Sequence, residues 1–181
     1  MSTRRTIQIV LDYNQVKKES RDFTPMKVEL RKTPSKGVGI FATSKIENEE
    51  VVCFYQLQAF RLATYKSATN NAYCFAVYTV NGNESKTFLG DLVPESLQPP
   101  RKVDGIYIPY WGYFSNEPSP EQKSNVWVDM NLEENYLSRK RLKDGDYVVY
   151  KLVATRTIQP GDEIVWHYGS SYYGRDYKVS K

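Results

Sequence analysis

Histidine and cysteine are scarce in this chain of 181 residues, which has one histidine, His167, and two cysteines, Cys53 and Cys74. Together they cannot build a tetrahedral zinc site, which takes about four such ligands. Both cysteines lie in apolar runs, where a buried reduced thiol is the expected state, and they do not indicate a disulfide scaffold. The sequence therefore predicts a protein that needs no metal and lies in a reducing, intracellular compartment.

Long apolar segments are missing as well. No run approaches membrane-spanning length, and the N-terminal stretch MSTRRTIQIVLDYN lacks the apolar core of a signal peptide. Charge is nearly balanced, because 25 Lys and Arg residues face 21 Asp and Glu residues for a net charge of +4. This excess is too small to imply a nucleic-acid partner, so a nucleic-acid-binding β domain is a remote alternative. We expect neither a membrane protein nor a secreted one.

Tyrosine, by contrast, is abundant, with 15 residues in the chain. Aromatic enrichment favours strands and aromatic-lined pockets over a helical bundle, although ordinary β packing explains any single tyrosine equally well. Runs rich in Val, Ile, Tyr and Phe predict strands at 6–13, 26–32, 38–43, 49–60, 72–80, 86–92, 105–114, 125–132, 146–158 and 162–169. Helix signals are weak, and the better candidates are residues 62–69 and 132–142. The fold class that follows is mostly β (α+β).

Three separated segments carry residues suited to ligand chemistry. In the first, SKGVGIFATSKI (residues 35–46), Gly37 and Gly39 flank Val38 just before an apolar strand. Glycines at such a place let the backbone turn tightly and come close to a ligand. The third glycine and the helix of a dinucleotide-binding motif are missing, so taken alone this GxG is also explained by an ordinary turn.

The second segment, YWGYFSNEPSPEQKSNVWV (residues 110–128), is an aromatic run that stops at Asn116. Asn116 could cap a turn or hold a polar ligand. The third segment, TRTIQPGDEIVWHYGSSYYG (residues 155–174), contains an extended stretch in which Trp166 and Tyr168 share one strand face while His167 points the other way.

The order and content of these segments resemble the SET-domain protein lysine methyltransferases. The family's opening signature matches Gly37, Gly39, Phe41 and Ala42. Its middle signature, Asn-His-Ser then Pro-Asn, resembles Asn116, Glu117 and Pro118 followed by Asn125. Its closing signature matches Gly161, Asp162, Glu163, Tyr168 and Gly169. The resemblance divides the chain into an N-terminal extension (1–25), a SET domain (26–174) and a C-terminal tail (175–181).

The resemblance implies short strands in several small sheets, with a C-terminal segment threaded through a loop in a knot-like manner. It implies S-adenosylmethionine as methyl donor and a protein with an accessible lysine as substrate; a histone tail is one candidate, which would place the protein in the nucleus. Tyr168 is the implied catalytic residue. The implied donor site comprises Lys36, Gly37, Val38, Gly39, Asn116, Glu117 and Tyr173, and the implied substrate site comprises Tyr55, Tyr73 and Tyr172.

The middle signature departs from the family pattern. Glu117 and Pro118 stand where the family has histidine and serine, and proline cannot donate a backbone N–H. The cysteine clusters that bind zinc in many histone-directed relatives are also missing. A catalytically inactive SET-like module that binds proteins or peptides is therefore the alternative interpretation.

Overall fold

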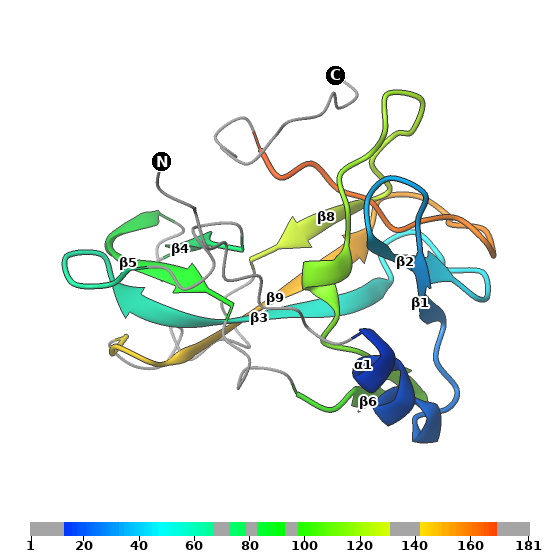
Figure 1. The fold of residues 1–181 in the computed structure, drawn as a ribbon, viewed down its shortest axis with the longest axis horizontal. Coiled ribbons are helices and arrows are strands. Elements are labelled where there is room, and N and C mark those ends of the chain that lie inside the picture. Colours follow the sequence, from blue (N-terminus) through cyan, green and yellow to red (C-terminus); the bar gives the residue numbers. More distant parts are fainter. Residues whose placement is uncertain (1–12, 67–72, 79–82, 93–97, 131–141, 170–181) are drawn as a thin grey trace, which may run out of the picture. The chain divides into compact units, whose positions relative to one another are not determined.

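The computed structural model describes residues 13–66, 73–78, 83–92, 98–130 and 142–169 (Figure 1). Its regular elements are mainly short strands in small sheets, so the mostly β fold predicted from the sequence is confirmed. None of the helices in these residues is long and apolar enough to cross a membrane.

The chain forms two compact units. The described residues within 56–97 and 130–149 belong to the first unit, and those within 12–55, 98–129 and 150–181 belong to the second. Two strands, β3 (Val51–Arg61) and β9 (Tyr147–Ala154), run from one unit into the other along the chain.

The first unit is built on three antiparallel strands. The strands β4 (Phe75–Tyr78), β5 (Glu84–Asp91) and β3 are neighbours in that order. The ring of Phe60 stacks on that of Tyr65 at 4.0 Å, and the Tyr65 hydroxyl donates a hydrogen bond of 2.8 Å to buried Asp91. Its core contains the fully buried side chains of Leu57, Val77, Leu92 and Val148.

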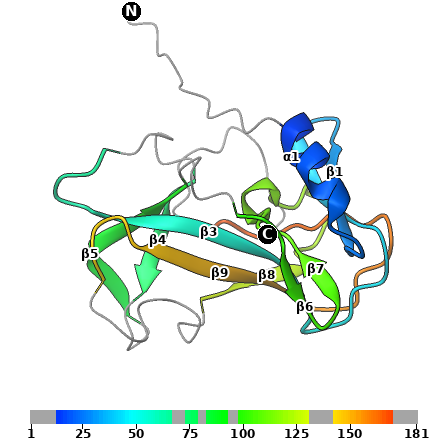
Figure 2. The ribbon, with the colours of Figure 1, turned by 90° about the horizontal axis from the view of Figure 1, so that it is seen from below.

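The second unit contains most of the remaining elements: α1 (Tyr13–Glu19), η1 (Ser20–Asp22), β1 (Val28–Lys32), β2 (Val38–Ala42), β6 (Arg101–Val103), β7 (Ile106–Ile108), η3 (Gly112–Phe114) and β8 (Val126–Asp129). β1 pairs antiparallel with β2, and β6 and β7 form a hairpin (Figure 2). β8 pairs antiparallel with the end of β9. The paired residues Leu30 and Ile40 are buried, as is Leu152 of β9, so these strands supply the core of the unit.

The C-terminal segment 162–168 lies between two other parts of the second unit. On one side Phe41 of β2 forms an antiparallel bridge with Glu163, and the N–H of Ile164 donates to the carbonyl of Ile40 at 2.8 Å. On the other side Asn116 forms a parallel bridge with Val165.

The side chain of Asn125, in the 116–125 loop, makes two hydrogen bonds to the same segment. Its Nδ2 donates to the Glu163 carbonyl at 2.8 Å, and its Oδ1 accepts the Val165 N–H at 2.9 Å. Ile164, Val165 and Trp166 are all buried, as expected for a segment covered on both sides. The segment is therefore held between β2 on one side and the 116–125 loop on the other.

Three predicted elements are wrong within the described residues. The strand predicted at 162–169 is an extended stretch with isolated bridges at Glu163 and Val165 and not a regular strand. The strand predicted at 105–114 ends at Ile108, and η3 forms instead because Gly112 packs directly on Tyr55. Residues 62–64 form a turn and not the start of a helix, and Leu62 is exposed, so this stretch lacks the buried apolar face that stabilises a helix.

Other predicted elements lie outside the described residues, wholly or in large part: the strand at 6–13, the second half of the helix at 62–69 and the helix at 132–142. Helix α1 was not predicted. Its sequence, YNQVKKE, has no acidic residue in the first turn and no clear apolar stripe.

The packing around η3 generates a stability prediction. A Cβ at Gly112 would lie 2.7 Å from Cβ of Tyr55 and 2.9 Å from the carbonyl oxygen of Phe54, atoms that cannot rotate away. We expect Gly112→Ala to lower the free energy of unfolding by about 3 kcal/mol in a urea titration. Gly105→Ala is the control: a Cβ there meets nothing within 4 Å, and its φ of +83° makes the cost about 1 kcal/mol. Equal losses in both variants would contradict the prediction.

Candidate functional site

The turn that precedes β2 contains the first predicted donor residues. The N–H and the hydroxyl of Thr33 both donate to the carbonyl of Gly37, at 2.6 and 3.1 Å, and the Lys36 N–H donates to the Thr33 hydroxyl at 2.8 Å. Gly37 has a φ of +77°, in the left-handed region that favours glycine, and a Cβ there would meet nothing within 4 Å. The turn therefore presents the exposed backbone of Gly37 to open space.

Gly39 is crowded where Gly37 is open. A Cβ at Gly39 would lie 2.9 Å from Oε1 of Glu163 and 3.0 Å from Nδ2 of Asn116. The second glycine of the GxG thus admits two of the protein's own polar side chains to the backbone of β2. The sequence alone suggested close approach by a ligand at this position.

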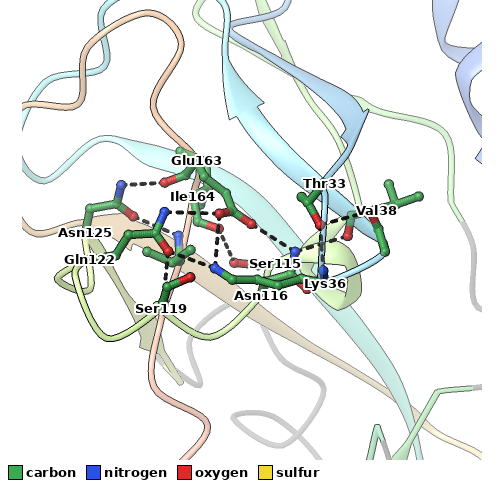
Figure 3. A network of polar contacts seen from close by, with 12 residues as sticks. Thr33, Lys36, Val38, Ser115, Asn116, Ser119, Gln122, Asn125, Glu163 and Ile164 are labelled. Carbon is green, nitrogen blue, oxygen red and sulfur yellow. Dashed lines mark hydrogen bonds and ion pairs between the residues drawn. The ribbon is translucent and has the colours of Figure 1, made fainter. Parts of the chain in front are cut away.

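Glu163 is the centre of a polar network that joins all three sequence segments (Figure 3). Its Oε1 accepts a hydrogen bond from Asn116 at 3.0 Å, and the same Asn116 amide donates to the carbonyl of Val38 at 3.2 Å. Its Oε2 accepts from Lys36 Nζ and from Gln122 Nε2, both at 3.2 Å. Lys36 also donates to Gln122 at 2.8 Å.

Burial makes this network energetically costly to break. The Glu163 side chain is only 8% exposed and that of Lys36 is 20% exposed. A buried carboxylate is tolerated when a cation and hydrogen-bond donors surround it, and here Lys36, Asn116 and Gln122 supply them. The network thereby fixes the position of Asn116 relative to the GxG turn.

Tyr168, the predicted catalytic residue, is held at two points. Its hydroxyl donates to the carbonyl of Ser115 at 2.7 Å, and its backbone N–H donates to Oε1 of Glu117 at 2.8 Å. Its ring contacts that of Trp166 at 5.0 Å, whereas His167 is exposed. The neighbours therefore point in opposite directions, as strand alternation predicts, and the role of Tyr168 stays a prediction.

The structure places the remaining predicted residues in different surroundings. Glu117 is buried, with 3% exposure, and its side chain contacts the main chain of Tyr168. Tyr55 is buried in the second unit, where its ring makes an edge contact with Tyr113 at 6.4 Å. Tyr73 is half-buried in the first unit, and burial raises the pKa of its hydroxyl. Tyr172 and Tyr173 lie outside the described residues.

Three residues of this arrangement were given no functional role from the sequence: Ser115, Gln122 and Glu163. Glu163 could have been found, because it belongs to the closing signature and follows an acidic turn. Gln122 lies in a proline-rich loop without a recognisable pattern, and Ser115 acts on Tyr168 through a backbone carbonyl that any residue would provide. Across the part of the chain that the structure describes, no three His, Cys, Asp or Glu side chains gather to hold a metal ion.

The comparison with protein-family models agrees with the sequence signatures. The SET-domain family model matches residues 37–169. A search of the curated proteins finds no match. Among solved structures, a Plasmodium falciparum protein named as a candidate histone methyltransferase has a TM-score of 0.47 at 17% identity, covering 82% of this chain and 98% of that one.

Two further solved structures are similar at the same level. The methyltransferase domain of human PR domain-containing protein 2 has a TM-score of 0.45 at 18% identity, covering 81% of this chain and 80% of that one. KRYPTONITE in complex with mCHH DNA, an H3(1-15) peptide and SAH has a TM-score of 0.45 at 16% identity, covering 86% of this chain and 26% of that one.

The buried network predicts the effect of removing its centre. Glu163→Ala would leave Lys36 without its ion pair and would remove an acceptor from the half-buried amides of Asn116 and Gln122, of which Asn116 keeps its bond to the carbonyl of Val38. We expect the free energy of unfolding to fall by about 2 to 3 kcal/mol in a urea titration. Glu29→Ala, which removes the exposed partner of Arg31, is the control and should change it by less than about 0.5 kcal/mol. If Glu163→Ala is as stable as the control, the network does not stabilise the fold.

Proposed function

The chain belongs to the SET-domain family, and from this premise we propose that it is an S-adenosylmethionine-dependent protein-lysine N-methyltransferase. The observation that carries the proposal is the position of Tyr168 in the closing signature, with its hydroxyl fixed on the Ser115 carbonyl. The substrate is a protein with an accessible lysine. A histone tail fits this description, and the enzyme would then act in the nucleus.

The residues around the GxG turn suit the methyl donor. The methionine part of S-adenosylmethionine is a zwitterion, and this site offers the Lys36 ammonium, the Glu163 carboxylate and the Asn116 amide within one network. The open space beside Gly37 leaves its backbone accessible for close approach. We therefore assign Lys36, Gly37, Val38, Gly39 and Asn116 to donor binding.

When bound, S-adenosylmethionine supplies an electrophilic methyl group. The task of the protein is then to deliver a neutral lysine amine in line with it, and positioning supplies most of the rate. Removing the proton from a lysine with a pKa near 10.4 costs about 4 kcal/mol at pH 7.4, and burial among aromatic side chains lowers that cost.

Tyr168 is suited to orient the reacting groups. Because its hydroxyl proton is directed to the Ser115 carbonyl, the phenolic oxygen keeps its lone pairs for an amine N–H or for a polarised methyl group. The Ser115 carbonyl is itself a second oxygen at the same place. Two oxygens fixed by the fold can orient an amine without any metal.

A second candidate function is a catalytically inactive module that binds proteins or peptides. The specific observation in its favour is the altered middle signature, in which Glu117 and Pro118 replace histidine and serine. The two candidates differ in donor binding, which only the methyltransferase requires.

We expect Tyr168→Phe to lower turnover on the order of 10²-fold, because it removes the hydroxyl and keeps the ring. Donor affinity should hardly change. His167→Ala is the matched control, since His167 is the exposed neighbour, and it should keep most of the activity. The assay is methyl transfer to a mixture of core histones and lysine-rich peptides. A dead His167→Ala variant beside a fully active Tyr168→Phe variant would overturn the assignment.

Donor binding gives a separate test. Isothermal titration calorimetry should detect S-adenosylmethionine binding with unchanged affinity in the presence of a chelator. Gly39→Val should weaken binding at least about tenfold, because its side chain would displace Glu163 and Asn116. Gly105→Ala, in the β6–β7 turn, should bind normally. No detectable binding by the wild type would favour the inactive module, and a strict requirement for a divalent ion would exclude the proposed site.

A further inference from the structure

Residues 115–117 run alongside the C-terminal segment and contact it at successive positions. The Ser115 hydroxyl donates to the Ile164 carbonyl at 3.0 Å. The Asn116 carbonyl accepts the Trp166 N–H at 3.1 Å, within the parallel bridge between Asn116 and Val165. A continuing parallel ladder would next use the backbone of residue 118.

Proline at 118 cannot continue that ladder as a donor, because it has no N–H. The next N–H of the C-terminal segment on this side belongs to Tyr168, and the acceptor that meets it is a side chain, Oε1 of Glu117, at 2.8 Å. The side-chain carboxyl of Glu117 thus accepts from the N–H that a continuing ladder would direct to the carbonyl of residue 118.

We propose that Glu117 is a positioning residue for Tyr168: its buried carboxylate fixes the tyrosine backbone so that the hydroxyl stays on the Ser115 carbonyl. The inference deepens the proposed function and rests on it for its catalytic consequence. The structural part rests only on the contacts of Glu117, Ser115 and Tyr168.

The location of Tyr168 makes such a hold necessary. The chain turns immediately afterwards at Gly169, which has a φ of +94°, so Tyr168 ends the extended stretch. The two contacts grip different ends of the residue, the backbone N–H and the phenolic hydroxyl. Fixing both ends restricts rotation of the side chain about the main chain, which a single contact would not do.

The chemistry of the acceptor adds to its strength. A hydrogen bond in the low-dielectric interior of a protein is electrostatically stronger than one in water. Glu117 is only 3% exposed, so water competes little for its carboxylate. Glu117, which stands where the family has histidine, therefore supports Tyr168 through a side-chain hydrogen bond to its backbone.

The test uses two substitutions of similar volume. Glu117→Met fills the site without an acceptor, whereas Glu117→Gln keeps an acceptor oxygen. We expect Glu117→Met to lower kcat about tenfold or more, with KM and donor affinity within about threefold of the wild type, and Glu117→Gln to keep most of kcat. Hydrogen exchange of the Tyr168 amide, followed by NMR, should be roughly tenfold faster in Glu117→Met and nearly normal in Glu117→Gln.

Val148→Ala is the control for general loss of stability, since Val148 is fully buried in the first unit. It should leave both kcat and Tyr168 exchange unchanged. If Glu117→Met does not fold, Glu117→Leu takes its place. Normal kcat and normal Tyr168 exchange in the variant without an acceptor would overturn the proposal, as would a Glu117→Gln variant that loses kcat while its Tyr168 exchange stays normal.

The proposed function and the proposed positioning role of Glu117 can be tested separately. If the wild type transfers no methyl group, the proposed function is wrong, and exchange of the Tyr168 amide alone then decides whether Glu117 holds the tyrosine. If the wild type is active and only the positioning is wrong, exchange of the Tyr168 amide will be normal in both the Met and Gln variants.

Discussion

The site depends on one buried carboxylate that serves two parts of the chain at once. The Glu163 side chain takes hydrogen bonds from Lys36, Asn116 and Gln122, while its backbone pairs with Phe41 and accepts from Asn125. A charge with 8% exposure would be costly without these partners. Because the partners come from two segments that are far in the sequence from each other and from Glu163, satisfying this one charge brings the GxG turn, the 115–125 loop and the C-terminal segment together.

That constraint gives the two glycines of the GxG different physical roles. Gly37 is required by its left-handed backbone and faces open space, whereas Gly39 is required because Glu163 and Asn116 occupy the room of a side chain. The two glycines look equivalent in the sequence, but their surroundings in the fold are different. The backbone of Gly37 faces open space, whereas that of Gly39 lies against Glu163 and Asn116.

The sequence predicted the parts of this arrangement that follow from local pattern. Short apolar runs predicted β2, β3 and β9, and the three signatures predicted which segments would meet. It did not predict η3, because the packing of Gly112 on Tyr55 joins residues far apart in the chain. The hydrogen bond between Gln122 and Glu163 could not be predicted either, since nothing in the sequence around a loop glutamine indicates its partner. Strand alternation did predict that His167 and Tyr168 point apart.

The altered middle signature is easier to reconcile with an active site once the contacts of Tyr168 are considered. The acceptor for its hydroxyl is a backbone carbonyl, which depends on the path of the chain at Ser115 and not on the side chain there. That path is set by the hydrogen bonds of residues 115 and 116 to Ile164 and Trp166. Substitution at 117 and 118 therefore leaves this acceptor in place, provided that the new residue still holds the Tyr168 backbone. Glu117 meets that condition with a hydrogen bond of 2.8 Å, so the residue that stands in place of the family's histidine contacts the Tyr168 backbone directly.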